Sequence, residues 1–404
     1  MPRTLNITSI GDDVAFLQEQ LNAHPPTVLP LLVVDGNFGP ETFDRVKEYQ
    51  TNSALAVDGI VEAHTWGVLL GHTTRETIGF FVLGRNLYDS VGTNVLLRGV
   101  NKMCVWDQDP DPGSLTSFSE IKKTGANTVR IVWAITSELT SGGTPTQIAT
   151  LDSLIGNAKA NHLIPMIELH DATCEWSRLN DLVNYWTQPA VVSVIQTHQA
   201  YLLVNIGNEV GNETVSQADF VAGYSDAVQR MREAGIHTPF VIDSSDCGKN
   251  LQMLNGTAAP LLAADPDFNL IFSVHAYWSK ECDFDEPKIR SMLQQAVGLG
   301  YPLIVGEFSG YGGWPCKSPL GTSMCSPAGE IDYQTILAVS HELQIGWYAW
   351  EWGPGNGFTD PLCVNMDMTP DRLFVNLKSP GWAYEVAISS PFGIQKTAVT
   401  PASI

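Results

Sequence analysis

Basic residues are scarce in this sequence. Its 404 residues include 22 Lys and Arg against 43 Asp and Glu, which gives a formal net charge of −21 at pH 7. A field of that sign repels nucleic acids and anionic membranes, so the composition argues against functions that bind polyanions. An uncharged polymer, such as a polysaccharide, is the partner that the charge balance favours.

Long apolar runs are also missing. No uncharged apolar run reaches the roughly 18 residues of a membrane-spanning helix, and the opening MPRTLNITSI lacks a basic region followed by an apolar one. We therefore expect no membrane span. We also expect a secreted or cell-wall-associated protein whose signal peptide is absent from this chain. Hydrophobic residues make up 44% of the sequence, which is too many for a disordered chain.

The seven cysteines are odd in number, so at least one has no partner within the chain. Cys316 and Cys325 flank a short loop rich in Gly, Pro and Ser, and either a disulfide closes that loop or the two stay apart. The other cysteines are scattered, without the short Cys pairs of a zinc site, and His24, His64 and His72 show no metal spacing. The sequence therefore predicts no metal and no cofactor.

The first stretch, to about Gly71, has a helical pattern. DDVAFLQEQLNA places Val14, Leu17 and Leu21 at helical spacing, and FGPETFDRVKEYQ has a proline in its first turn. An Asp-Gly turn followed by a threonine occurs twice, in VDGNFGPET and in VDGIVEAHT. Twin turn-helix units of this kind would pack as a small all-α domain.

From Phe80 onward the pattern changes. FFVLGRNLYDSVGTNVLLRGVN predicts two β-runs around an Asp/Ser/Gly/Asn turn. With VLLRGVN counted as the first, eight short apolar runs then alternate with longer helical stretches. Eight such units in about 300 residues predict a (β/α)8 TIM barrel. A doubly wound open sheet is the alternative, but no Gly-rich phosphate loop follows the first strand. The expected organisation is a helical domain (1–71), a linker (72–79), the barrel (80–390) and a C-terminal tail (391–404).

Polar or aromatic residues close nearly every predicted strand. In chain order they are Arg98 and Asn101, Arg130 and Trp133, Glu168 and His170, Asn208 and Glu209, Asp243, His275 and Tyr277, Glu307, and Trp350 and Glu351. The carboxyl ends of barrel strands meet at one rim, so we expect these residues to converge. Glu209 and Glu307 would face each other across the mouth. Paired carboxylates suit glycosidic bond cleavage, although ordinary surface acids are the plainer explanation.

The chain resembles glycoside hydrolase family 5, of clan A. The motifs that carry the resemblance are LRGVN, GANTVRIVW, IELHDAT, VNIGNEV, SVHAYW, VGEFSG and WYAWEW, in family order over roughly residues 80–390. IELHDAT, followed by LNDLVNYW, is most similar to the bacterial endo-β-1,4-mannanases. The resemblance implies endo-acting cleavage of mannan, galactomannan or glucomannan with retention, through a glycosyl-enzyme intermediate and carboxyl groups about 5–5.5 Å apart.

Position by position, the resemblance assigns Glu209 as acid/base and Glu307 as nucleophile. It implies that Arg130 keeps Glu307 ionised and that Tyr277 donates a hydrogen bond to the same carboxylate. The remaining residues expected to bind substrate are Asn208 at the sugar 2-hydroxyl, His170 and His275 along the cleaved-sugar subsite, Trp350 as a stacking face, and Trp133 and Trp278 as further platforms.

Three features depart from the mannanase pattern. Val210 stands where many mannanases have Trp, and WEWGPGN brings a third acid, Glu351, in place of a lysine. YGGWPCKSPLGTSMCSP after Glu307 resembles an inserted loop. The reaction type is unaffected, but the substrate preference is left open between mannan and another neutral β-glycan such as cellulose.

The N-terminal stretch resembles the peptidoglycan-binding-like domain, through its two Asp-Gly turns, EYQ and HTWGVLL. That resemblance implies attachment to cell-wall glycan; the alternative is a module that only packs on its neighbour. Further alternatives for the whole chain are an endo-β-1,4-glucanase, a non-catalytic cell-wall-binding protein, a peptidoglycan hydrolase, or a Cys-dependent hydrolase using Cys174 with His170. We expect a monomer.

Overall fold

The computed structural model describes residues 2–24, 28–71, 78–106, 116–138, 143–357 and 359–404. The helices are α1 (Asp12–Ala23), α2 (Pro40–Asn52), α3 (Ala63–Leu70), α4 (Ser117–Lys122), α5 (Ile148–Ala160), α6 (Leu179–Trp186), α7 (Pro189–His198), α8 (Gln217–Glu233), α9 (Leu251–Ala264), α10 (Glu286–Gly298), α11 (Tyr333–Glu342), α12 (Trp382–Tyr384) and α13 (Ile394–Thr397). The strands are β1 (Phe81–Leu83), β2 (Asn86–Tyr88), β3 (Arg98–Met103), β4 (Thr128–Trp133), β5 (Ile164–Leu169), β6 (Leu203–Asn205), β7 (Phe240–Asp243), β8 (Leu270–His275), β9 (Leu303–Glu307) and β10 (Gly346–Ala349).

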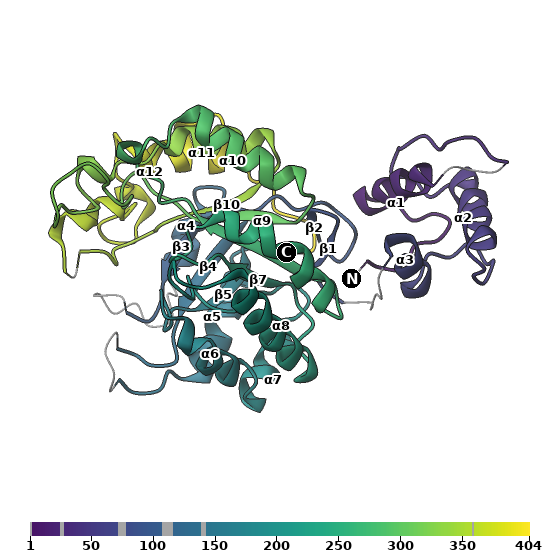
Figure 1. Cartoon of the computed structure of the whole chain (residues 1–404), viewed down its shortest axis with the longest axis horizontal. Helices are drawn as coiled ribbons and strands as arrows, with labels where there is room; N and C mark the ends of the chain where they lie inside the picture. The colour runs from purple at the N-terminus through teal and green to yellow at the C-terminus, as the bar shows by residue number, and fades with distance from the viewer. Residues whose placement is uncertain (1, 25–27, 72–77, 107–115, 139–142, 358) are drawn as a thin grey trace.

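Helices α1 to α3 form a small bundle around Trp66, whose side chain is fully buried (Figure 1). Val14, Leu17 and Leu21, which the sequence places on one face of α1, belong to the same apolar cluster. The helical periodicity therefore predicted both the helix and the face that it buries.

The repeated Asp-Gly turns form a structural repeat as well. The side-chain oxygen of Gln18 accepts hydrogen bonds from the backbone of Asp35 and Gly36, each at 3.0 Å. Its amide nitrogen donates to the Asp35 carboxylate at 2.9 Å. Gln50 makes the same bonds to the turn at residues 58–59. In each unit a helical glutamine satisfies the backbone of the turn that follows it.

The β1–β2 hairpin joins the two parts of the chain. Its turn lies at Gly84, whose φ is +55°, so the predicted turn at Asp89–Asn94 is a second one, after the hairpin. Phe81 and Tyr88 stack with ring centroids 5.6 Å apart and belong to the apolar core of the helical bundle. Val82, on the opposite face of β1, belongs to the apolar cluster at the barrel floor. One short hairpin thus contacts both cores.

Strands β3 to β10 form a closed parallel barrel in the order β10-β3-β4-β5-β6-β7-β8-β9. Trp347 of β10 pairs with Arg98 of β3 and also with Val305 of β9, so the sheet has no open edge. The predicted TIM barrel is confirmed, and the open doubly wound sheet is excluded.

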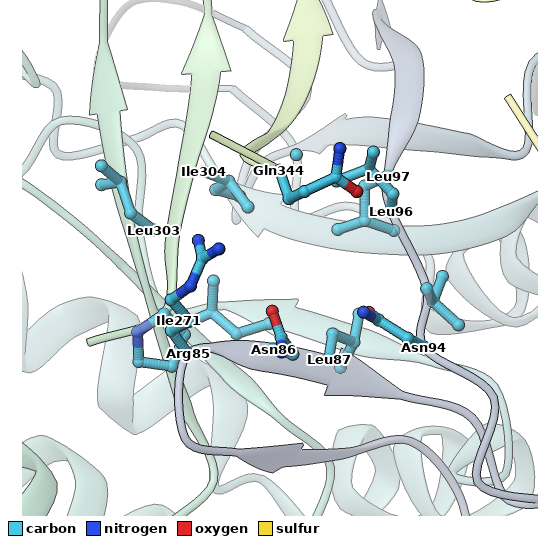
Figure 2. Close-up of a pocket in the computed structure, with 13 residues that line it drawn as sticks. Arg85, Asn86, Leu87, Asn94, Leu96, Leu97, Ile271, Leu303, Ile304 and Gln344 are labelled. Atoms are coloured by element: carbon cyan, nitrogen blue, oxygen red, sulfur yellow. The ribbon is translucent and has the colours of Figure 1, made fainter. Parts of the chain in front are cut away.

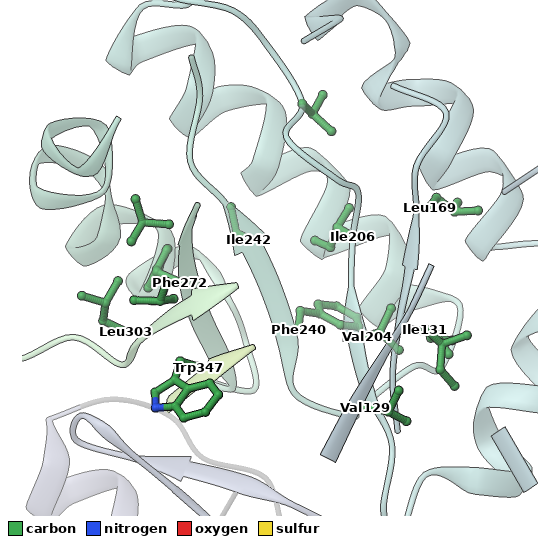
Figure 3. Packing of buried hydrophobic residues seen from close by; sticks show 14 of the residues in the cluster. Val129, Ile131, Leu169, Val204, Ile206, Phe240, Ile242, Phe272, Leu303 and Trp347 are labelled. Atoms are coloured by element: carbon green, nitrogen blue, oxygen red, sulfur yellow. The ribbon is translucent and has the colours of Figure 1, made fainter. Parts of the chain in front are cut away.

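Alternation along the strands separates two layers of the core. Phe240 and Ile242 of β7 pack outward against the helices (Figure 3). Val241, between them, belongs to the apolar cluster at the floor of the barrel. In β10, Trp347 is outside and Tyr348 inside, where its hydroxyl meets Thr128 Oγ1 at 2.9 Å. This period-two pattern directs the polar residues near the carboxyl ends of the strands toward the barrel axis.

Arg98 does not belong to the rim, contrary to the prediction. It begins β3, at the floor of the barrel, where its guanidinium donates to the Ile345 carbonyl at 2.7 Å and lies over the Trp347 ring. The sequence motif identified the strand correctly, but the strand starts at the residue that had been placed at its end. Arg98 therefore supports the floor and takes no part in the pocket at the opposite end.

A narrow cavity lies at this floor, between the hairpin and strands β8 to β10 (Figure 2). Arg85 crosses its edge and donates to the Leu343 carbonyl at 2.8 Å. The segment predicted as a C-terminal tail also packs here: Ile404 is buried among the floor residues, and Lys159 donates to its carbonyl at 3.0 Å. Among the described residues, no helix is both long and apolar enough to cross a membrane.

Candidate functional site

The segment VNIGNEV leaves the sheet earlier than its apolar pattern predicts. Strand β6 ends at Asn205, although the backbone of Asn208 still donates to the Leu169 carbonyl at 2.9 Å. At the bend, a Cβ on Gly207 would lie 2.2 Å from Leu182 Cδ1, so any larger residue would have to displace that side chain. The chain then turns at Glu209, whose φ of +49° lies in the left-handed region that side chains other than Gly seldom adopt. The turn brings the Glu209 carboxylate to the mouth of the barrel.

Neighbouring groups hold this strained backbone on both sides. The Glu209 amide donates to the Asp243 carboxylate at 3.1 Å, and the Glu209 carbonyl accepts from the Cys174 amide at 2.8 Å. A disulfide joins Cys174 to Cys247, and the Cys247 amide donates to the Gly211 carbonyl at 2.9 Å. Strained residues persist where the surroundings over-determine them, often at active sites.

Glu209 and Glu307 lie together, as predicted. Together with His275 they offer ligand atoms that all lie within 4.8 Å of one another. Their side chains are nearly buried, with 9% and 3% exposure, and both line a pocket of about 380 Å³ at the mouth of the barrel. Four more of the predicted site residues line the same pocket: His170, Asn208, Tyr277 and Trp350.

Arg130 is the polar centre beneath the pocket. Its buried guanidinium donates to Glu307 Oε1 at 2.7 Å, to Asn208 Oδ1 at 2.8 Å and to Asn205 Oδ1 at 2.8 Å. Burial lowers the pKa of Arg130, but the nearby carboxylates, Glu168 foremost, raise it above its usual value, so the group stays charged. The expected contact with Glu307 is present. Arg130 also holds the side-chain amides of Asn205 and Asn208 in position near the mouth of the barrel.

Glu307 accepts a second strong hydrogen bond, from the Tyr277 hydroxyl to Oε2 at 2.7 Å. Burial raises the pKa of Glu307 above its usual value; His275 and Arg130 oppose the rise without cancelling it, and the charge of Glu209 adds to it. Both oxygens of Glu307 are therefore held by donors, which orients the carboxylate and favours its charged form.

His275 lies below the pocket and does not line it. It is fully buried, and its Nδ1 is 2.7 Å from Glu209 Oε1, while its Nε2 is 3.4 Å from the Asp243 carboxylate. Burial lowers the pKa of His275, but Glu307, Asp243 and the hydrogen bonds raise it to about 10. The imidazolium in turn helps to lower the pKa of buried Asp243 to about 2, against the effect of burial. His275 was expected to contact the sugar, but it lies beneath the two glutamates and outside the pocket lining.

The opposite wall of the pocket is aromatic. The rings of His170 and Trp350 stack at 5.7 Å, and Trp106 meets His170 edge-on at 5.6 Å. Glu168 Oε1 lies 2.9 Å from His170 Nδ1; burial lowers the pKa of His170, but the charge of Glu168 and this hydrogen bond raise it overall. The indole of Trp350 donates to Asn356 Oδ1 at 3.1 Å, which fixes the plane of its ring.

The other predicted residues have different surroundings. Asn208 lines the pocket, but its amide is already engaged by Arg130 and by Thr173 Oγ1, at 3.0 Å. Trp133 is buried and donates to the Tyr185 hydroxyl at 2.9 Å, so its indole is not available to a sugar. Trp278 is also buried, although its edge lines an adjoining cavity.

Glu351, the third acid, lies behind the aromatic wall. It is fully buried, and its carboxylate accepts from the Met103 amide at 3.0 Å and from the Asn356 side chain at 3.1 Å. Asn356 also donates to Asp367 at 2.6 Å. Glu351 therefore supports the residue that orients Trp350, and it does not reach the mouth.

The disulfides differ from the pairing considered from the sequence. Cys316 forms a disulfide with Cys282, and Cys325 forms one with Cys363. The pairing of Cys316 with Cys325 that the sequence suggested is therefore wrong. The two cysteines flank the same loop, but each ties it to a different neighbouring segment that the sequence spacing did not indicate. Cys104 belongs to none of the three disulfides. Since Cys174 is also oxidised, the Cys-dependent hydrolase is excluded.

Sequence reasoning missed several residues that the site requires. Asn205 and Thr173 position Arg130 and Asn208, and Asn356 fixes Trp350. Asn205 carried a usable signal, because a polar residue inside an apolar strand points to the barrel axis. Thr173 and Asn356 lie in loops, where no periodicity assigns a direction to a side chain.

Comparison with known proteins agrees with this geometry. Residues 88–356 match the family model "Cellulase (glycosyl hydrolase family 5)", and residues 10–69 match "Putative peptidoglycan binding domain". The mannan endo-1,4-beta-mannosidase of Streptomyces lividans is 30% identical over 328 residues, which cover 79% of this chain and 78% of that protein. The enzyme of the same name from Salipaludibacillus agaradhaerens is 29% identical over 73% of this chain and 88% of its own length.

Solved structures give the same result. The β-mannanase from Thermomonospora fusca superposes with a TM-score of 0.66 at 30% identity, over 80% of this chain and 98% of that one. The catalytic domain of a mannanase from Streptomyces sp. SirexAA-E gives a TM-score of 0.67 at 28% identity, over 82% and 96%. With the family model matching most of the chain and a pair of carboxylates at the mouth of the barrel, this protein is a glycoside hydrolase and belongs to family 5.

Proposed function

We propose that this protein is a retaining endo-β-1,4-mannanase with Glu209 as acid/base and Glu307 as nucleophile. The observation that supports it best is the approach of their carboxylate oxygens to within 4.8 Å. Retaining glycosidases hold their carboxyl groups about 5–5.5 Å apart, whereas inverting enzymes need about 6.5–9.5 Å to admit a water molecule.

In the first step a Glu307 oxygen attacks the anomeric carbon while Glu209 gives its proton to the glycosidic oxygen, and the bond between that carbon and oxygen breaks. The leaving chain departs, and the sugar is left as an ester of Glu307. In the second step Glu209 takes a proton from water, the water oxygen attacks the same carbon, and Glu307 is released as a carboxylate. Each step inverts the carbon once, so the product retains the starting configuration.

The surrounding groups fit these two roles. Tyr277 and Arg130 each hold one oxygen of Glu307 at 2.7 Å, which favours the ionised nucleophile. His275 occupies Oε1 of Glu209, so Oε2 is the oxygen that carries the transferable proton. His170 and Trp350 form the wall against which the cleaved sugar stacks.

Mannan is proposed as the substrate because the relatives at 29–30% identity are named mannan endo-1,4-beta-mannosidases. An endo-β-1,4-glucanase is the second candidate, since a relative at 25% identity is named "Beta-mannanase/endoglucanase A". Initial reducing-sugar release from galactomannan, glucomannan, carboxymethylcellulose and xylan separates the two. We expect galactomannan and glucomannan to be cleaved fastest; faster cleavage of carboxymethylcellulose would favour the glucanase. Glu307→Gln is the matched control and abolishes release from every polymer.

For the N-terminal bundle we propose binding to cell-wall glycan, in a secreted or wall-associated monomer. The family match of residues 10–69 supports this. The full chain should sediment with purified peptidoglycan in the absence of mannan. If the bundle only packs on the barrel, the protein stays in the supernatant.

A further inference from the structure

We propose that the loop 312–330 extends the active-site pocket into a binding surface for the leaving portion of the polysaccharide, with Trp314 as its stacking platform. This inference rests on the proposed function, because it identifies the part of the substrate that this surface binds. The loop follows β9 directly and corresponds to the segment in which the sequence departs from the mannanase pattern.

A second cavity adjoins the active-site pocket and shares residues with it. Tyr277, Lys249 and Trp314 line both spaces, so the two lie side by side. The second space, of about 840 Å³, is larger than the pocket of about 380 Å³ that holds the glutamates. Both volumes fall in the usual range of ligand sites, about 300–1,000 Å³. A chain that enters the first space can therefore continue into the second.

The position of the second cavity identifies which part of the substrate it receives. It is lined by segments that follow β7 and β8, on the side of the acid/base: a Cβ on Gly248 would lie 3.0 Å from Glu209 Cγ. The wall formed by His170 and Trp350 follows β5 and β10 instead. Because the acid/base protonates the oxygen that leaves, the sugars beyond that oxygen lie on the β7–β8 side.

Trp314 is exposed but held in place. It is 62% exposed, whereas the other tryptophans are buried or half-buried. Before it, the Gly313 amide donates to the Gly329 carbonyl at 2.9 Å; after it, Cys316 is bonded to Cys282. An exposed indole on a backbone fixed at both ends gives a flat apolar face with little ordering cost on binding.

The rest of the cavity has the composition of a sugar site. Trp278 and Phe284 stack at 5.8 Å to form an apolar wall. Asp246, Lys249 and Gln252 supply donors and acceptors around the same cavity. Ring faces with interspersed polar groups suit an uncharged β-linked glycan, whose sugars present apolar faces and hydroxyl edges.

The test compares two substrates in Trp314→Ala. Mannohexaose places sugars on the leaving side, whereas an aryl β-mannobioside places only the aryl group there. We expect kcat/KM for mannohexaose to fall at least about fivefold, kcat/KM for the aryl substrate to change less than twofold, and Trp314→Phe to restore most of the loss. Leu320→Ala is the control, because Leu320 is fully exposed on the same loop and lines neither cavity.

Equal losses on both substrates would overturn the inference and show a general structural role for Trp314. An unchanged kcat/KM for mannohexaose would overturn it as well. The proposed function fails in a different way: wild-type protein would then be inert toward mannohexaose. In that case cellohexaose and an aryl β-cellobioside replace the two substrates, and the same pattern of losses decides the inference. Wild-type protein inert toward both hexaoses rejects the proposed function and the inference together.

Discussion

The Tyr277 hydroxyl donates to Glu307 Oε2 over 2.7 Å, and both side chains line the pocket at the mouth of the barrel. A hydrogen bond to a charged group contributes about 1.5–3 kcal/mol. Removing it in Tyr277→Phe should lower kcat/KM about tenfold to a hundredfold.

The same substitution also shifts the pH dependence. Loss of a donor to the carboxylate raises the pKa of Glu307, so the acidic limb of the kcat/KM profile moves to higher pH. Tyr333→Phe is the matched control, because its hydroxyl bonds Glu385 at 2.8 Å, away from the pocket. A Tyr277→Phe profile that overlays the wild type would remove Tyr277 from this role.

His275 should make the stability of the fold depend on pH. Its pKa is about 10 in the folded protein, against 6.5 for an unperturbed histidine, so the native state holds a proton that the unfolded state releases. The stabilisation of the fold by protonated His275 is fully present below pH 6.5 and is lost as the pH rises through about 10. The free energy of unfolding should fall across this interval by up to about 1.4 kcal/mol per pH unit. Urea denaturation of wild type and His275→Gln at several pH values measures it, and the variant should lack this slope; equal slopes in both proteins would contradict the assignment.

The Cys174–Cys247 disulfide should matter for catalysis, since the Cys174 amide bonds the Glu209 carbonyl at 2.8 Å. In the double variant Cys174→Ser/Cys247→Ser, Glu209 loses one support of its backbone. We expect kcat to fall about tenfold to a hundredfold with KM nearly unchanged, because small misplacements of a catalytic group are costly. Cys104→Ser, which replaces a cysteine outside the disulfides, is the control. Full activity in the double variant would show that the other contacts suffice to hold Glu209.

The helical bundle should stabilise the barrel through the hairpin. Deleting residues 1–78 uncovers Phe81, Leu83 and Tyr88, which are now buried against the bundle. A buried side chain of this size contributes about 1.5–3 kcal/mol, so the melting temperature should fall by several degrees. Differential scanning calorimetry measures the change, and an added Phe81→Ser/Tyr88→Ser pair should reduce aggregation of the shortened chain. An unchanged melting temperature would show that the two parts are independent.

The barrel and the positions of its two glutamates could be predicted from the sequence for a physical reason. Parallel strands are buried on both faces, so runs such as NTVRIVW stand out, and closure of the sheet brings their carboxyl ends together. The position of Glu209 after β6 and of Glu307 at the end of β9 followed from those rules. Arg98 was misplaced because the run VLLRGVN does not show where the strand begins.

Contacts between loops were less accessible. The disulfide partners of Cys316 and Cys325 depend on how three loops approach one another, which no local pattern encodes. The burial of His275 beneath the glutamates, and of Trp133 against Tyr185, likewise depends on the three-dimensional packing of side chains from several strands. A sequence motif can identify such a residue without showing whether its side chain faces the substrate pocket or is buried beneath it.

The stereochemistry of the first product tests the central claim most directly. With an aryl β-mannobioside as substrate, proton NMR in the first minutes of the reaction distinguishes the two anomers before they interconvert in solution. A nucleophilic Glu307 close to Glu209 predicts that the β-anomer appears first and that the α-anomer grows in only later. Initial formation of the α-anomer would contradict the covalent intermediate and the roles assigned to both glutamates.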